Sequence, residues 1–158
     1  MKQKLKLALV GAGERGQYCY APYAKMHGYE IEFVAVADPH KGRREKFVQD
    51  YHVPAEGVFE TAEQFFARPR MADAVLICTQ DSQHYAYACQ AIDLGYSILL
   101  EKPISPSVRE CLDLQRRAEE KGTQIMVCHV MRYTKFYRKL KELIDSGVIG
   151  DVVHVTHT

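Results

Sequence analysis

The sequence predicts a doubly wound α/β domain built on a mostly parallel, six-stranded sheet. Three observations predict it: short hydrophobic runs alternate with longer amphipathic runs, a glycine-rich turn follows the first run, and a carboxylate closes the second. Uninterrupted hydrophobic strands are typical of parallel sheets that helices cover on both faces. Alternation of strands and helices implies right-handed crossovers between neighbouring strands, and therefore a layered α/β fold.

Six strands and six helices are expected. The strands are predicted at residues 6–10, 31–37, 57–60 (a weak edge strand), 74–79, 97–100 and 124–128. The helices are predicted at residues 14–27, 41–51, 61–67, 82–94, 106–121 and 134–146.

Local signals punctuate the last two helices. Ser105 is the expected cap of the fifth, Pro106 its first residue and Gly122 its left-handed stop. Gly147 is expected to end the sixth helix. The inward-facing stripe of that helix is predicted to consist of Phe136, Leu140, Leu143 and Ile144.

The end of the chain predicts a domain boundary. After Gly150 an alternating segment begins, although a six-stranded domain is already complete. We therefore expect residues 1–150 to form one domain. Residues 151–158 are expected to form the first strand of a truncated second domain, an α+β sheet domain.

Composition excludes several classes of protein. The 158 residues contain 47% hydrophobic and 26% charged residues, which is typical of a packed soluble domain, with a net charge of +1. No strong positive field favours nucleic acid or a membrane surface, and no apolar run approaches the roughly 20 residues of a membrane span. The five cysteines are odd in number and lack CxxC spacing, so neither disulfides nor a metal site is expected. We expect a cytoplasmic protein.

The turn after the first strand predicts a dinucleotide site. Gly11 permits a tight turn, Gly13 lets a diphosphate approach the backbone, and Gly16 allows close packing of helix and strand. Free amides at the start of the following helix favour the diphosphate. Glu14 and Arg15 lie within this loop and are also expected at the cofactor.

Asp38 bears on the choice between NAD and NADP. It closes the second strand 22 residues after Gly16, the offset expected of a carboxylate that binds the adenosine ribose. A carboxylate there repels a 2′-phosphate, which favours NAD. Lys41, Arg43 and Arg44 follow and offer partners for such a phosphate, so NADP stays open. An alternative role for Asp38 is a helix cap before Pro39.

Polar side chains also follow the later strands, at the edge of a parallel sheet where ligands bind. The fourth strand leads into Thr79, Gln80 and His84, the fifth into Glu101, Lys102 and Pro103, and the sixth into His129 and Arg132. The residues expected to line the cofactor are Gly11, Gly13, Glu14, Arg15, Gly16, Asp38, Thr79, Gln80, His84, Glu101, Lys102 and His129.

These motifs resemble the N-terminal part of the Gfo/Idh/MocA oxidoreductase family. The matching features are the glycine motif, Asp38, Thr-x-x-x-x-His at 79–84, Glu-Lys-Pro at 101–103, and Arg-Tyr-x₆-Lys-x-Leu-Ile-x-x-Gly-x-Ile-Gly at 132–150. The resemblance covers essentially the whole chain. It implies a Rossmann fold and NAD(P)-dependent redox chemistry on a sugar, polyol or related hydroxy compound.

The resemblance also implies roles for the Glu-Lys-Pro motif. Lys102 is the expected catalytic residue and faces the substrate, Glu101 helps hold the lysine or the cofactor ribose, and Pro103 often follows a cis peptide in this family. Partial burial beside a cationic nicotinamide would lower the pKa of Lys102. An ammonium group there would stabilise a developing alkoxide.

Several assignments stay open. Many relatives have Pro where this chain has Gln80, and Asn where it has His129, which either contacts the nicotinamide side or fills a strand end. His84 either lines the pocket or is a satisfied histidine at a helix start. Arg132 either pairs with a substrate anion or with a nearby carboxylate.

The activity is expected to belong to a longer parent protein. Family members place an Asp/His pair in a C-terminal sheet domain, so this chain is expected to bind the dinucleotide with little turnover. A homo-oligomer is expected, because truncation exposes apolar surface. The alternatives are an NAD-dependent glycosidase that oxidises its sugar transiently, and a non-catalytic dinucleotide sensor.

Overall fold

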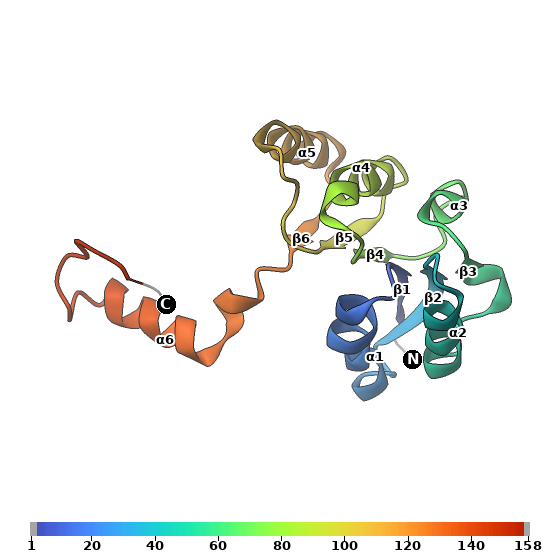
Figure 1. Ribbon diagram of the computed structural model, residues 1–158, viewed down its shortest axis with the longest axis horizontal. Helices are drawn as coiled ribbons and strands as arrows, with labels where there is room; N and C mark the ends of the chain where they lie inside the picture. The colour runs from blue at the N-terminus through green and yellow to red at the C-terminus, as the bar shows by residue number, and fades with distance from the viewer. Residues whose placement is uncertain (1–2, 157–158) are drawn as a thin grey trace. The chain divides into compact units, whose positions relative to one another are not determined.

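The computed structural model describes residues 3–156 of the chain, which divide into two compact units between Cys128 and His129. Figure 1 shows the course of the chain through these units. Each unit is described by itself. No helix within the described residues combines the length and the apolar character that crossing a membrane requires.

The first unit contains a sheet in which, within the described residues, six strands lie in the order β3-β2-β1-β4-β5-β6. Every pair of neighbouring strands is parallel, so the sheet is wholly parallel rather than mostly so. The order reverses between β1 and β4, which is the switch point of a doubly wound sheet. The strands are β1 (Leu5–Val10), β2 (Ile31–Ala37), β3 (Val58–Phe59), β4 (Ala74–Ile77), β5 (Ser97–Leu100) and β6 (Ile125–Val127).

The helices lie close to their predicted positions. In the first unit they are η1 (Glu14–Tyr20), α1 (Pro22–Met26), α2 (Lys41–Tyr51), η2 (Ala55–Gly57), α3 (Ala62–Phe66), η3 (Asp81–Gln83), α4 (His84–Asp93) and α5 (Val108–Lys121). The second unit contains η4 (Val130–Tyr133) and α6 (Lys135–Asp145). The first helix differs from its prediction, because a π-helical segment, η1, precedes the short α1.

Both faces of the sheet are buried. On β1, Leu7 and Leu9 belong to a core shared with Phe47 of α2, whereas Ala8 and Val10 belong to the core on the opposite face. This two-sided burial explains why the strand is continuously hydrophobic in sequence.

The start of α5 corrects one prediction. The helix begins at Val108, two residues later than expected, and its cap is Ser107, whose Oγ accepts a hydrogen bond from the Glu110 amide. Ser107 and Glu110 have the Ser-x-x-Glu spacing of a capping box, which competes with the predicted Ser105 and Pro106 pair. Ser105 is instead buried, and its hydroxyl accepts from the Ser107 amide. Gly122 ends the helix with φ +64°, as predicted.

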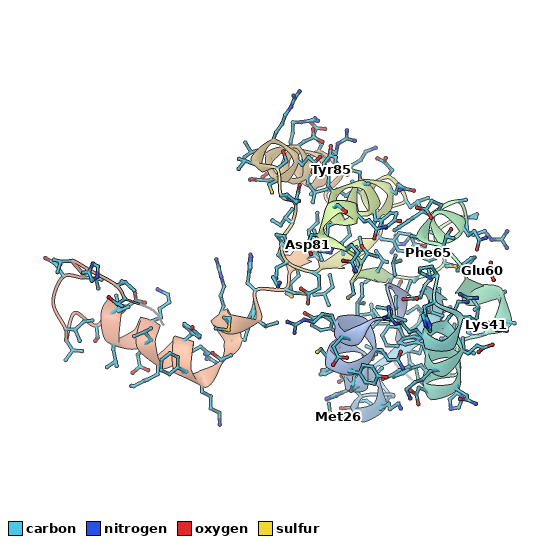
Figure 2. All side chains as sticks on the ribbon, in the orientation of Figure 1. Met26, Lys41, Glu60, Phe65, Asp81 and Tyr85 are labelled. Carbon is cyan, nitrogen blue, oxygen red and sulfur yellow. The ribbon has the colours of Figure 1, made fainter. Side chains whose placement is uncertain are left out.

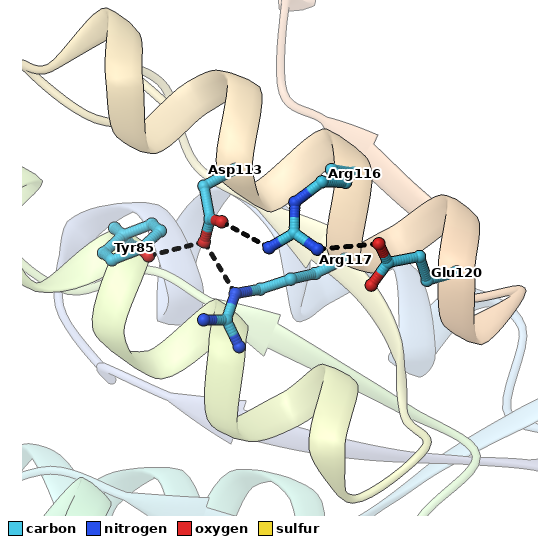
Figure 3. A network of polar contacts seen from close by, with 5 residues as sticks. All are labelled: Tyr85, Asp113, Arg116, Arg117 and Glu120. Atoms are coloured by element: carbon cyan, nitrogen blue, oxygen red, sulfur yellow. Dashed lines mark hydrogen bonds and ion pairs between the residues drawn. The ribbon is translucent and has the colours of Figure 1, made fainter.

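A polar network joins α4 to α5 (Figure 3). The Tyr85 hydroxyl donates to Asp113 at 2.7 Å, and Arg116 and Arg117 contact the same carboxylate at 2.7 and 2.6 Å. Hydrogen bonds from Arg116, Tyr85 and Arg117 hold the pKa of Asp113 well below its ordinary value. The bond to Asp113 raises the pKa of Tyr85 to about 12.

The second unit bears on two further predictions. The predicted inward stripe of α6 is exposed, with Phe136 69% and Leu140 41% accessible, because one helix and one short turn offer no second layer to pack against within this unit. Residues 151–156 form no strand, so the predicted start of a second sheet domain is not seen there. A strand requires a hydrogen-bonded neighbour, and these residues have none in their own unit. Residues 157–158 lie outside the described residues.

Candidate dinucleotide site

Two of the three motif glycines are required by packing. Gly11 turns the chain out of β1 with φ +93°, and a Cβ there would lie 2.5 Å from the carbonyl oxygen of Cys78. A Cβ on Gly16 would lie 2.4 Å from the carbonyl oxygen of Gly11 and 2.8 Å from a methyl carbon of Leu9. Both contacts are far shorter than van der Waals distance, so the fold itself excludes a side chain at each position.

Gly13 differs from the other two. The nearest heavy atom to a Cβ at this position is Nη1 of Arg43 at 3.9 Å, so packing leaves room for a side chain. Its φ of −79° is also open to any residue. The absence of a side chain therefore keeps the space above this backbone free, as a diphosphate requires. Among residues 3–156, no side chain caps the amides at the start of η1.

Asp38 ties the end of β2 to this loop. The residue is 4% exposed, and its two carboxylate oxygens accept the backbone amides of Ala12 and His40, each at 2.8 Å. The cap of α2 is His40, whose ring nitrogen accepts from the Arg43 amide at 3.3 Å. The alternative role of Asp38 as that cap is therefore wrong.

The three basic residues after Asp38 have different surroundings. Arg44 is buried, donates to the Asp38 carbonyl oxygen at 2.6 Å and pairs with Glu60 at 3.2 Å. Lys41 pairs with Glu45 at 3.7 Å. Arg43 is exposed and extends toward Gly13. Arg44 is thus committed to the fold, whereas Lys41 and Arg43 are exposed.

The end of β4 carries Thr79, Gln80 and His84. The Thr79 hydroxyl is buried and has no hydrogen-bond partner among the described residues. The Gln80 amide donates to the Gln83 side chain at 3.3 Å in a capping box. His84, which is 1% exposed, starts α4 and places its ring nitrogens 2.6 Å from the Pro103 carbonyl oxygen and 3.2 Å from that of Thr79. This imidazole joins the end of β4 to the segment after β5.

Glu101 is the most connected side chain at the end of β5. It is 5% exposed, and its Oε2 accepts the Lys102 amide at 2.8 Å. Its Oε1 accepts a hydrogen bond from the Tyr20 hydroxyl and lies 3.8 Å from Nε of Arg15. The carboxylate thus faces the glycine loop and not the solvent.

Lys102 follows this buried carboxylate and is itself exposed, and the partial burial expected beside a bound nicotinamide stays a prediction. Lys102 is the second residue after β5, which ends at Leu100. The Lys102–Pro103 peptide bond is cis.

Tyr20 is the site residue that the sequence analysis missed. It lies at the end of η1, and burial together with hydrogen bonds to Cys128 and Glu101 raises its pKa well above the ordinary value. Tyr18, two residues earlier, is 55% exposed. A tyrosine soon after a glycine motif indicates a possible site residue. The sequence does not say which of the two tyrosines points inward, because the π-helical turn decides that.

His129 and Arg132 belong to the second unit, where both are exposed. The first unit therefore brings together Gly11, Gly13, Glu14, Arg15, Gly16, Asp38, Thr79, Gln80, His84, Glu101 and Lys102 at or next to the carboxyl ends of its strands.

A wholly parallel, doubly wound sheet with a glycine loop after β1 and a carboxylate after β2 defines the class of dinucleotide-binding Rossmann domains. Comparison with known families agrees: residues 5–129 match the Gfo/Idh/MocA oxidoreductase family, described as having an NAD-binding Rossmann fold. The chain belongs to this family.

Characterised relatives are longer than this chain. It is 31% identical over 157 residues to inositol 2-dehydrogenase of Pseudomonas savastanoi pv. phaseolicola, covering 97% of this chain and 46% of that protein. It is 26% identical over 149 residues to the NADP(+)-dependent scyllo-inositol 2-dehydrogenase IolW of Bacillus subtilis, covering 94% and 39%. The chain thus spans less than half the length of these relatives.

Solved structures share the fold. The WlbA dehydrogenase of Bordetella pertussis, in complex with NADH and UDP-GlcNAcA, superposes with a TM-score of 0.83 at 20% identity, over 94% of this chain and 44% of that one. At this identity the likeness concerns the fold.

Proposed function

We propose that this chain is the dinucleotide-binding part of an NAD(P)-dependent dehydrogenase that acts on a sugar, polyol or related hydroxy compound. In this proposal residues 1–150 form the binding domain, and residues 151–158 begin the next domain of a longer protein. The observation that carries the proposal is Gly13, whose missing side chain serves neither packing nor backbone conformation.

The remaining groups fit such a cofactor. The amides of the glycine loop would hold the diphosphate, and Asp38, already oriented by two backbone amides, has lone pairs left for the ribose hydroxyls. The unpartnered Thr79 hydroxyl offers a further polar contact at the same edge of the sheet. The bound dinucleotide would supply the hydride acceptor or donor.

Lys102 is the proposed proton-handling residue. Its exposed ammonium group leaves the sheet beside Glu101, where it would donate a hydrogen bond to the reacting oxygen of the substrate and stabilise a developing alkoxide. From the sequence alone, Arg132 is further proposed for the substrate and His129 for the cofactor. The family resemblance supports the substrate class, because two of the relatives act on inositols by name.

Calorimetric titration of this chain with NAD, NADH, NADP and NADPH tests the proposal. We expect binding of NAD and NADH, with weaker binding of the phosphorylated forms because the Asp38 carboxylate repels a 2′-phosphate. At a hundredfold excess over Kd, the ligand should stabilise the fold by about 2.7 kcal/mol, visible as a higher Tm. No heat and no change in Tm with any of the four would overturn the proposal.

The longer protein provides the second test. With an inositol or a sugar and NAD, we expect the parent protein to form NADH and its Lys102→Ala variant to lose most of the rate. The present chain alone should show no comparable turnover, because the second domain completes the site. Substrate-dependent NADH formation by this chain at the parent's rate would contradict that division of labour.

A further inference from the structure

Tyr20 connects two segments that lie far apart in sequence. Its hydroxyl donates to Oε1 of Glu101, 81 positions later, and its ring is half-buried. The Glu101 carboxylate in turn accepts the Lys102 amide through its other oxygen. An unbroken chain of hydrogen bonds therefore runs from the helix after the glycine loop to the backbone of the proposed catalytic lysine.

The irregular helix gives Tyr20 this position. The Ala21 amide donates to the Gly16 carbonyl oxygen at 3.0 Å, an i to i+5 bond that adds one residue to the turn. Within this segment Tyr18 and Cys19 are exposed, whereas Gln17 and Ala21 are buried and Tyr20 faces Glu101. Such π turns are frequent at functional sites. The extra residue changes the direction in which a side chain points and interrupts the regular α-helical hydrogen bonds.

We propose that Tyr20 is a positioning residue, which holds the Glu101 carboxylate away from the dinucleotide and thereby fixes the backbone at Lys102. The inference rests on the proposed function, since it concerns the same site. A buried carboxylate that loses a donor turns toward other donors. The charged donor that the structure places near it is Arg15, whose Nε lies 3.8 Å from Oε1. Without the hydroxyl, Glu101 would bind Arg15 more closely and compete with the diphosphate of the dinucleotide for that guanidinium group.

Tyr20→Phe is the first variant to test, because it removes one oxygen and keeps the ring. We expect its affinity for NADH to fall about tenfold, which corresponds to one charge-assisted hydrogen bond. Tyr18→Phe is the matched control, because it makes the same chemical change on an exposed residue of the same helix, and it should bind as the wild type does.

A double-mutant cycle separates positioning from packing. If Tyr20 acts through Glu101, then Glu101→Gln removes the charge that competes, and adding Tyr20→Phe to it should change the Kd of NADH less than twofold further. Additive losses would show that Tyr20 acts independently of Glu101 and would overturn the proposal. Wild-type affinity in Tyr20→Phe would overturn it equally.

The Lys102 amide resonance provides a readout without any dinucleotide. Its proton is bonded to the carboxylate, so Tyr20→Phe should move it upfield in the NMR spectrum, whereas Tyr18→Phe should not. An unmoved resonance would refute the positioning role even if NADH failed to bind, so the inference and the proposed function fail separately. Should Tyr20→Phe not fold, Glu101→Gln tests the acceptor directly, and an unmoved Lys102 amide in that variant would overturn the proposal.

Discussion

The two halves of the site, the glycine loop and the end of β5, differ in which atoms define them. Around the glycine loop, backbone atoms define the shape: a Cβ on Gly11 or Gly16 would overlap a main-chain oxygen, and Asp38 is held by two amides. Around β5, side chains from distant segments meet each other, as Tyr20 and Glu101 do; Figure 2 shows all described side chains on the fold. We infer that the first half tolerates no added atom at Gly11 or Gly16, whereas substitutions in the second half leave the fold intact but disturb the orientation of the remaining side chains.

Gly16→Ala should have the largest effect, because its Cβ would lie 2.4 Å from a backbone oxygen that cannot move without shifting β1 or the loop. We expect a loss of about 3 kcal/mol or more in the free energy of unfolding, measured by urea titration. Gly42→Ala is the control. Its Cβ meets the exposed His40 ring at 3.4 Å, and alanine favours a helix, so this variant should be as stable as the wild type or more stable.

Asp38→Asn tests the role of the two amide contacts in the glycine-loop half of the site. An asparagine side chain has one acceptor oxygen, so either the Ala12 or the His40 amide would face an NH₂ group. We expect a loss of about 1–3 kcal/mol in stability in addition to weaker NADH binding. Asp93→Asn changes an exposed carboxylate at the end of α4 and should stay within about 0.5 kcal/mol of the wild type. Equal stability of the two variants would contradict the tie between β2 and the loop.

Gly13→Ala tests whether the middle glycine serves the ligand alone. With 3.9 Å to the nearest atom, the added methyl group should leave the Tm of the free protein within about 2 °C. The affinity for NADH should fall at least about tenfold, because the methyl group occupies the space that a diphosphate needs. Calorimetry measures the Kd of NADH and melting curves measure the Tm, for this variant and for Gly16→Ala. A wild-type Kd in Gly13→Ala would remove the main support for a diphosphate at this loop.

The backbone-built half was predictable from sequence because its signals are local. Glycines at fixed spacing, a carboxylate after the second strand and continuous hydrophobic runs each follow from one segment at a time, and β2, β5 and α2 were predicted to the residue. The predicted start of α5 was two residues too early, because two serines are candidate caps in sequence. Only the burial of Ser105 in the folded protein decides between them.

The side-chain half was less predictable because its contacts join distant segments. The strand-end rule identified Glu101 and Lys102, but nothing in the spacing assigns the Glu101 carboxylate to Tyr20 or the two ring nitrogens of His84 to carbonyl oxygens. The exposed stripe of α6 has the same origin: helical periodicity indicates an apolar face but does not say what covers it.

The network between α4 and α5 should give the smallest effect, one that depends on pH. The pKa of Asp113 is lower in the folded protein than in the unfolded chain, so its stabilisation is present above the unfolded value, about 4, and is lost as the pH falls below it. Asp113→Asn should therefore lower the Tm slightly at pH 7, and the difference from the wild type should shrink toward pH 3. Melting curves at pH 7, 5 and 3 measure this, with the exposed Glu56→Gln as control. A difference that grows as the pH falls would show that the Arg116 and Arg117 contacts do not stabilise α5 against α4, because loss of those contacts on protonation requires the opposite sign.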